Sequence, residues 1–250
     1  MKKLFVLLVA LMCMMGVMSN ASAATYADIA FVIDQSGSMG DEFRWLGSSI
    51  GTINTGIQSA GITANYGVAG FVDTYGSADA RNAWVDMTSD IGAITTEVNW
   101  AASHLYGSME KSYNAADWAV NNFSWTGGNY AKVMILITDE YPYAGNSYSY
   151  GGLTGELAVA KMASDNNILL NVITSTGLYS YWNDAVYTKD AYSGLFDLNY
   201  LRTNPTQFTN DFIAAKTKEI QDYPTGVPEP ATLLLLGLGL VGLSGLRRKL

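Results

Sequence analysis

The stretch from Asp28 to Gly40 decides the fold, and it reads DIAFVIDQSGSMG. Its first six residues are almost continuously apolar, which is typical of a strand buried on both faces within a parallel sheet. A carboxylate, Asp34, follows the strand at once and opens a loop rich in serine and glycine. Because Gly37 and Gly40 permit tight bends, this loop can bring several side-chain oxygens together.

Strand-like and helical patterns alternate along the rest of the chain. Further strands are expected over 66–72, 133–137 and 168–173, with 83–87 as a hairpin or edge partner of the first of these. Apolar residues at helical spacing predict helices over 43–57, 91–105, 116–123, 157–162 and 208–220. This alternation predicts an α/β fold, a doubly wound and mostly parallel Rossmann-like sheet with helices on both faces.

Oxygen-bearing side chains follow two of the expected strands. Asp34, Ser36 and Ser38 follow the first strand, and Asp139 follows the strand over 133–137. Ligand sites of doubly wound sheets lie at the carboxyl ends of the strands, so these side chains are expected to meet there. Helix capping is a simpler role for serine and aspartate. A set of oxygen donors at two strand ends instead favours a hard cation, Mg²⁺ first, with Ca²⁺ and Mn²⁺ as alternatives.

The Asp-x-Ser-Gly-Ser loop, with Thr-Asp after a later strand, resembles the von Willebrand factor type A domain. The resemblance covers residues 24–224 and implies a metal-ion-dependent adhesion site. In that family an Asp-x-Ser-x-Ser loop supplies three contributors, here Asp34, Ser36 and Ser38. The resemblance makes Asp139 another contributor, and a residue of a middle loop the remaining one.

Two residues compete for the place in the middle loop. The family usually has Gly-Gly-Thr before a helix, and Ser108 directly follows Gly107 here. Glu110 lies five residues before Ala115, a spacing similar to that of integrin β-like members, in which this ligand is a glutamate. We favour Glu110. Three carboxylates around one dication are expected to raise metal affinity and to weaken the attraction for an acidic ligand.

Aromatic residues crowd the loops expected beside the metal. Tyr141 and Tyr143 follow Asp139, and Tyr181 and Trp182 follow the strand over 168–173. Tyrosine offers contact area and a hydroxyl at low entropic cost, so these four residues are candidates for a ligand-binding rim. Ordinary packing of the rings within the loops explains them equally well.

The N-terminus has the pattern of a secretory signal peptide over residues 1–23. Lys2 and Lys3 precede a short apolar run, and Ala21-Ser22-Ala23 forms a cleavage site. Cys13 lies within the apolar run and is expected to be removed with it. The mature protein would then contain no cysteine.

The C-terminus, residues 225–250, carries a second signal. Pro228-Glu229-Pro230 precedes an apolar stretch over 231–246, and basic residues follow at 247–249. The stretch predicts a membrane helix with its basic end in the cytoplasm. The combination resembles the PEP-CTERM sorting signal of Gram-negative bacteria, which implies removal by an exosortase-type membrane protease in a setting of exopolysaccharide and biofilm production.

Composition and charge exclude several functions. The 250 residues carry a net charge of −8. Five of the 14 basic residues and one of the 22 acidic residues lie in the two terminal segments, so residues 24–224 alone carry a net charge of −12. Such a body repels nucleic acid and other polyanions unless a metal bridges them. A single histidine and a single cysteine exclude a His/Cys zinc site and an intrachain disulfide.

These observations predict a secreted, metal-dependent binding module rather than an enzyme. Its ligand is expected to be an extracellular protein or an exopolysaccharide. The protein would be anchored in the inner membrane before processing and would reach the cell surface or extracellular matrix afterwards. A structural matrix or coat component, in which metal only stabilises the fold, is the alternative. A metal-assisted hydrolase is a third hypothesis, for which Glu140 is the only evident base.

Overall fold

A six-stranded sheet with the order β3-β2-β1-β4-β7-β8 forms the centre of the molecule. The computed structural model describes residues 25–72, 82–107, 110–143, 147–186 and 194–223. All neighbouring strands are parallel except β2 and β3, which are antiparallel. The strands are β1 (Thr25–Asp34), β2 (Ile62–Phe71), β3 (Trp84–Thr88), β4 (Tyr130–Ile137), β7 (Ile168–Thr174) and β8 (Leu195–Asp197). The predicted mostly parallel sheet and the edge position of residues 83–87 are confirmed.

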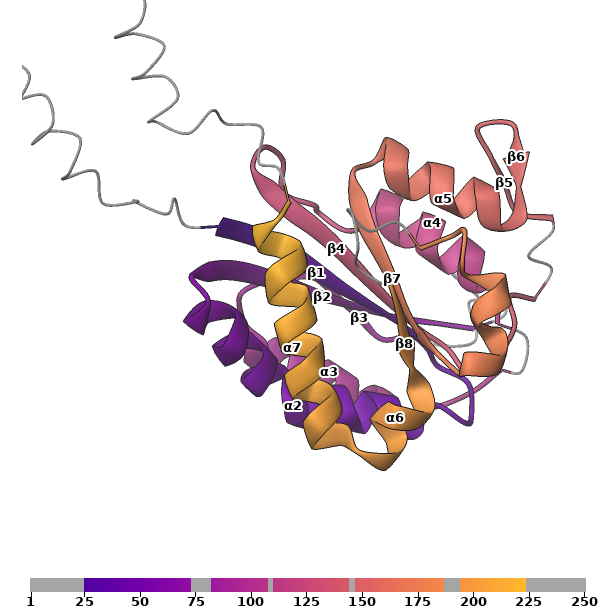
Figure 1. Ribbon diagram of the computed structural model, residues 1–250. Helices are drawn as coiled ribbons and strands as arrows, with labels where there is room; N and C mark the ends of the chain where they lie inside the picture. Colours follow the sequence, from indigo (N-terminus) through magenta and orange to yellow (C-terminus); the bar gives the residue numbers. More distant parts are fainter. Residues whose placement is uncertain (1–24, 73–81, 108–109, 144–146, 187–193, 224–250) are drawn as a thin grey trace, which may run out of the picture.

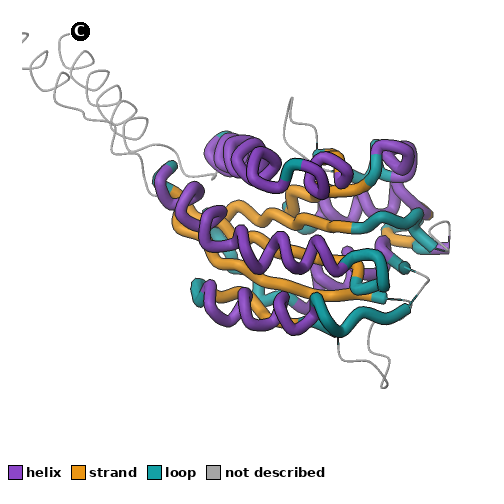
Figure 2. Tube along the Cα trace, turned by 90° about the horizontal axis from the view of Figure 1, so that it is seen from below, coloured by secondary structure: helices purple, strands orange, loops and turns teal. Residues whose placement is uncertain are grey.

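Helices cover both faces of the sheet (Figure 1). One layer contains α2 (Gly40–Ser59), α3 (Ile91–Ala101), the short α6 (Leu198–Thr203) and α7 (Pro205–Gln221). The opposite layer contains α4 (Ser112–Asn122) and α5 (Gly155–Asp165). Figure 2 shows the strands lying side by side among these helices. The doubly wound architecture predicted from the alternation is therefore present.

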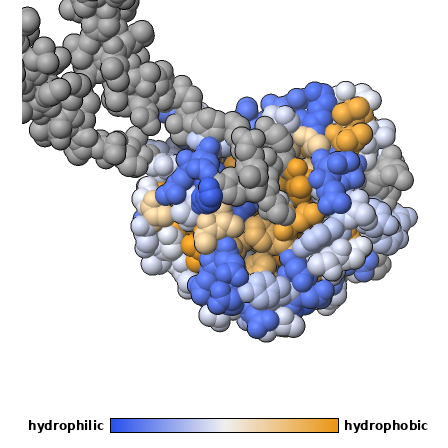
Figure 3. Space-filling view, viewed as in Figure 1, coloured by the Kyte–Doolittle hydropathy of each residue, from blue (hydrophilic) through white to orange (hydrophobic). Residues whose placement is uncertain are grey.

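Three small elements complete the fold. A two-stranded hairpin, β5 (Ser149–Tyr150) and β6 (Leu153–Thr154), precedes α5. A 3-10 helix, η2 (Thr176–Tyr181), follows β7. On the face seen in Figure 3, hydrophobic residues gather towards the centre and near α5, and hydrophilic residues occupy much of the remainder.

The apolar run in β1 is explained by burial on both faces. Ile29, Phe31 and Ile33 pack into the layer of α2 and α7, whereas Ala30 and Val32 pack into the layer of α4 and α5. Each of these side chains is at most 1% exposed. Burying a large aliphatic or aromatic side chain contributes about 1.5–3 kcal/mol, so this strand stabilises both layers at once.

The register of the sheet determines where the polar strand ends lie. β1 pairs with β2 on one side and with β4 on the other, and Ile33 lies opposite Ile137. The chain reverses its winding direction here, because successive strands are added on opposite sides of β1. Asp34 and Thr138, the next residues along each strand, are consequently neighbours at the carboxyl edge of the sheet.

The predicted targeting segments lie outside the described residues. These are the signal peptide over 1–23 and the membrane helix over 231–246. Within the part of the chain that the structure describes, none of the helices is both long enough and apolar enough to span a membrane.

Candidate metal centre

Asp34 ends β1 at the carboxyl edge of the sheet. Its side chain is fully buried, Oδ1 accepts a hydrogen bond from the backbone N–H of Ser36 at 2.8 Å, and Oδ2 accepts one from the Thr138 hydroxyl at 3.0 Å. Burial raises the pKa of Asp34 to about 7; the backbone hydrogen bond from Ser36 opposes this rise, and the negative charge of Glu110 adds to it. A bound cation would stabilise the carboxylate that this environment disfavours.

Hydrogen bonds link Asp34 to Asp139 through the backbone N–H of Ser36 and the hydroxyls of Ser36 and Ser38. The hydroxyl oxygens of Ser36 and Ser38 lie 3.2 Å apart, and the Ser38 hydroxyl donates to Oδ1 of Asp139 at 3.0 Å. Gly37 between the two serines has open space around the position of a Cβ atom, so the loop is not closed over by its neighbours. The structure thus brings together four of the five predicted metal ligands.

Glu110, the fifth predicted ligand, approaches from the segment before α4. It is almost fully buried, and its charge acts directly on Asp34. Its carbonyl oxygen accepts a hydrogen bond from the N–H of Tyr143 at 2.9 Å, which ties this segment to the loop after β4. The competing candidate, Ser108, lies outside the described residues. The preference for Glu110 therefore stays a prediction.

The donor chemistry fits a hard divalent cation. Carboxylate and hydroxyl oxygens converge on one point of the sheet edge, and such donors suit Mg²⁺, which commonly keeps part of its water shell. Among the described residues, no group of three or more histidine, cysteine, aspartate or glutamate side chains is placed to hold a metal ion. A cation here would thus rely on Asp34, Asp139, the serine hydroxyls and water, with Glu110 as the predicted fifth contributor, directly or through water.

Arg202 is a component of the site that sequence reasoning missed. Its Nη2 donates to Oδ2 of Asp139 at 3.0 Å, and its Nε donates to Oε1 of Glu42 at 2.6 Å. Arg202 belongs to α6, a short helix that the apolar pattern did not predict, and no local motif connects it with Asp139. Only the fold places this guanidinium beside a predicted metal ligand.

The four aromatic residues predicted for the rim differ in their exposure. Tyr141 and Tyr181 are 52% and 47% exposed, and their ring centroids lie 6.4 Å apart, so the structure brings these two residues together at the surface. Tyr143 is also exposed. Trp182 is wrong as a rim residue, because its side chain is fully buried and packs edge-on against Tyr113 with 4.9 Å between ring centroids. Trp182 therefore belongs to the hydrophobic core on the side of the sheet that α4 and α5 cover.

Gln35 is a second residue that sequence reasoning missed. Its buried side chain donates to the carbonyl oxygen of His104 at 2.7 Å and accepts from the N–H of Ala83 at 2.9 Å. These bonds fasten the loop after β1 to the segments before β3 and after α3. Gln35 thereby helps to hold the neighbouring Asp34 in place.

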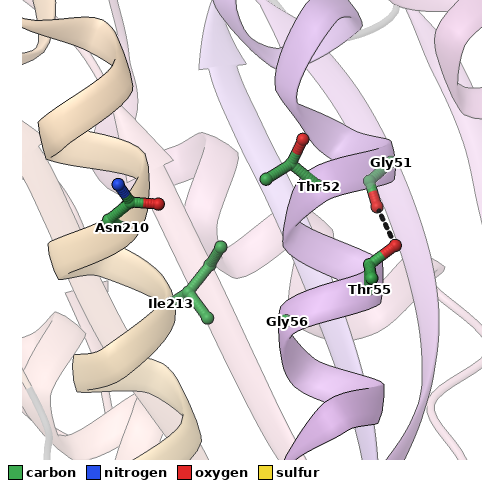
Figure 4. Close-up of a pocket in the computed structure, with 6 residues that line it drawn as sticks. All are labelled: Gly51, Thr52, Thr55, Gly56, Asn210 and Ile213. Atoms are coloured by element: carbon green, nitrogen blue, oxygen red, sulfur yellow. Dashed lines mark hydrogen bonds between the residues drawn. The ribbon is translucent and has the colours of Figure 1, made fainter.

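A surface pocket of about 460 Å³ lies between α2 and α7, away from the strand ends (Figure 4). Its lining residues are Gly51, Thr52, Thr55, Gly56, Asn210 and Ile213. None of these side chains is ionisable. It offers neither catalytic groups nor a set of cation ligands, so the site at the strand ends remains the candidate.

The sequence matches two known protein families. Residues 28–193 match the von Willebrand factor type A domain family, and residues 226–249 match the PEP-CTERM protein-sorting motif. The chain belongs to the von Willebrand factor type A domain family. No curated protein matches the sequence.

Two solved structures illustrate the shared fold. The pilus adhesin SpaC from Lactobacillus rhamnosus GG is 16% identical, with a TM-score of 0.51, over 80% of this chain and 31% of that one. Proximal thread matrix protein 1 from the mussel byssus is 15% identical, with a TM-score of 0.50, over 78% of this chain and 46% of that one. This chain therefore spans less than half the length of either protein.

Proposed function

We propose that this protein is an exported binding module that holds a divalent cation at the carboxyl ends of β1 and β4. The observation that carries the proposal is the hydrogen-bonded chain from Asp34 through Ser36 and Ser38 to Asp139. These side chains come from two strand ends that the sheet register makes adjacent, and all of their donor atoms are oxygens.

The cation, most suitably Mg²⁺, would be held by Asp34, Ser36, Ser38 and Asp139, with Glu110 in support. Its chemistry would be to bind an oxygen of the ligand at an open coordination position. That oxygen would come from a carboxylate of an extracellular protein or of an acidic polysaccharide. Because the body of the protein is strongly acidic, a bridging metal is the means by which it would attract such a ligand.

The exposed tyrosines extend this site into a recognition surface. Tyr141 lies on the loop after β4, and Tyr181 ends η2, which follows β7, so both follow strand ends at the edge of the sheet that carries the acidic residues. Their rings are available for stacking on sugar faces or for packing against a peptide. Tyr143 is linked to the metal centre through the backbone bond to Glu110.

The sorting motif supports a role outside the cell. In the proposed sequence of events, the tail over 225–250 anchors the protein in the inner membrane until an exosortase-type protease removes it. The protein then acts at the surface or in the matrix of a biofilm. Proteins that share the fold include an adhesin and a thread matrix protein, which is compatible with either attachment or matrix assembly.

The test is binding of the purified protein to immobilised extracellular protein and to acidic and neutral polysaccharides, with Mg²⁺ or with a chelator. We expect binding to one of these surfaces only with Mg²⁺, and we expect Tyr143→Ala to weaken it without lowering thermal stability. If binding and stability instead fall together in every variant, the structural matrix role replaces this proposal. Turnover of a hydrolysable ligand that Asp34→Ala abolishes would replace it with an enzymatic role.

A further inference from the structure

Arg202 contacts two carboxylates and the loop that carries the serines. Besides its bonds to Asp139 and Glu42, its Nη2 lies 3.3 Å from the carbonyl oxygen of Ser38 and 3.7 Å from the sulfur of Met39. The side chain is 31% exposed, so it forms part of the wall of the site and is still reached by solvent. The guanidinium is therefore built into the metal centre and is not an incidental surface charge.

Both oxygens of Asp139 accept hydrogen bonds from other side chains of the protein. Oδ1 accepts from the Ser38 hydroxyl at 3.0 Å, and Oδ2 accepts from Arg202 at 3.0 Å. An incoming dication would thus meet a carboxylate whose charge is partly neutralised. The cation would also lie near the guanidinium of Arg202, which is bonded to the same carboxylate. The two positive charges repel each other.

Glu42 keeps the guanidinium in this position. Its side chain is fully buried in the first turn of α2, and Oε1 receives the Nε of Arg202 at 2.6 Å. Oε2 has no hydrogen-bond donor among the described residues. If Arg202 swung away, Glu42 would remain as a buried charge without its partner, which is strongly unfavourable. The planar fork of arginine suits this double contact, because separate N–H groups point at each acid.

We propose that Arg202 is an internal counter-cation that occupies Asp139 in the metal-free protein and competes with the divalent cation for it. The inference rests on the proposed function and adds a residue that sets the strength of metal binding and the charge of the loaded site. Three carboxylates, Asp34, Glu110 and Asp139, would outweigh a dication. Arg202 reduces this excess of negative charge, to which Glu42 adds one more, and so favours an acidic ligand oxygen at the bound cation.

The test compares Mg²⁺ affinities by calorimetry in variants that avoid an unpaired buried acid. Glu42→Gln keeps Arg202 and removes the buried charge, and Glu42→Gln/Arg202→Met then removes the guanidinium as well. We expect the double variant to bind Mg²⁺ roughly tenfold more tightly than Glu42→Gln. Lys218→Met, which removes an exposed cation near the C-terminal end of α7, is the control and should bind as the wild type does.

Arg202→Lys separates charge from geometry. If repulsion between cations sets the affinity, this variant should stay within about twofold of the wild-type Mg²⁺ affinity. Equal or weaker Mg²⁺ binding by the double variant, relative to Glu42→Gln, would overturn the proposal and leave Arg202 as a residue that merely orients Asp139.

Thermal melting gives a readout that a purely structural role would not produce. We expect the rise in melting temperature on adding Mg²⁺ to be larger for the double variant than for Glu42→Gln, because tighter binding to the folded state stabilises it more. Equal rises would contradict the proposal. If the wild type and Glu42→Gln both fail to bind Mg²⁺, the metal site itself is absent and the inference falls with it.

Discussion

The Ser38 hydroxyl donates a hydrogen bond to Oδ1 of Asp139 at 3.0 Å, although the two residues are 101 positions apart in the chain. The pairing of two strands fixes the positions of both residues. Ser38 belongs to the loop after β1, and Asp139 follows the adjacent strand β4. The contact exists because the parallel pairing of β1 and β4 brings their carboxyl ends together, and it defines the place where a cation would bind.

Substitutions of Glu110 and Ser108 are expected to affect Mg²⁺ affinity differently. We expect Glu110→Gln to weaken Mg²⁺ binding at least several-fold, because it removes a negative charge beside Asp34 that would attract the cation directly. Ser108→Ala should leave the affinity nearly unchanged. Calorimetric titration of both variants decides between them. The reverse order of effects would assign the middle-loop position to Ser108.

The exposed and buried aromatic residues should differ in their effect on stability. Trp182→Ala removes a fully buried indole and is expected to cost about 3–5 kcal/mol of unfolding free energy. Tyr141→Ala, at a half-exposed position on the same edge of the sheet, should change the free energy of unfolding by less than about 1 kcal/mol. Urea denaturation measures both values. A large loss in Tyr141→Ala would show that this ring packs structurally and is not free for a ligand.

A buried ion pair in α7 is expected to be sensitive to the loss of one partner. Nζ of Lys216 lies 2.5 Å from Oε2 of Glu219 and 2.5 Å from Oδ1 of Asn171, and both charged side chains are nearly inaccessible. Lys216→Met leaves the carboxylate of Glu219 without its cation and should cost about 3–5 kcal/mol.

Lys218 supplies the matched control for that prediction. It forms an exposed pair with Asp222 in the same helix, and Lys218→Met should cost less than about 1 kcal/mol. The double variant Lys216→Met/Glu219→Gln should recover part of the stability lost in Lys216→Met, because no unpaired charge remains. Urea midpoints that are equal for Lys216→Met and Lys218→Met would argue against a stabilising role of the buried pair.

Gly70 should not tolerate a side chain, because a Cβ atom there would lie 2.1 Å from Oε1 of Gln35 and 3.1 Å from the backbone nitrogen of Ala83. Gly70→Ala therefore displaces the carboxamide that holds Ala83 and the segment at His104, and we expect a loss of about 1–3 kcal/mol.

The control for this prediction is Gly51→Ala on α2, where nothing lies within 4 Å of the added atom. Because alanine favours helix more than glycine does, this variant should be as stable as the wild type or up to about 1 kcal/mol more stable. Thermal or urea denaturation compares the two variants. A Gly70→Ala protein as stable as Gly51→Ala would show that Gln35 rearranges without loss.

The sequence was sufficient to predict the doubly wound sheet and the meeting of Asp34, Ser36, Ser38 and Asp139. Short apolar runs such as 29–33 and 133–137 identify buried parallel strands, and the rule for strand ends then places the polar residues that follow them. These features are encoded locally and repeated along several elements, so the pattern of the chain is enough to predict them.

Arg202 and Trp182 show where that reasoning ends. β8 has three residues and α6 has six, and such short elements show no recognisable periodicity of apolar residues. The sequence around Arg202 therefore does not indicate that this residue lies at the site. Trp182 directly follows a 3-10 helix, and whether one indole at such a place turns inward depends on contacts with Tyr113, which is distant in sequence. Both outcomes are set by tertiary packing and not by local preference.

Calorimetric titration of Mg²⁺, Ca²⁺ and Mn²⁺ into the purified protein, beside Asp34→Ala, tests the central claim most directly. We expect the folded wild type to bind at least one of these cations at a single site and Asp34→Ala to bind none of them. Circular dichroism of both proteins confirms that each is folded. A folded wild type that binds none of the three cations, or equal binding by Asp34→Ala, would contradict a metal centre at the ends of β1 and β4.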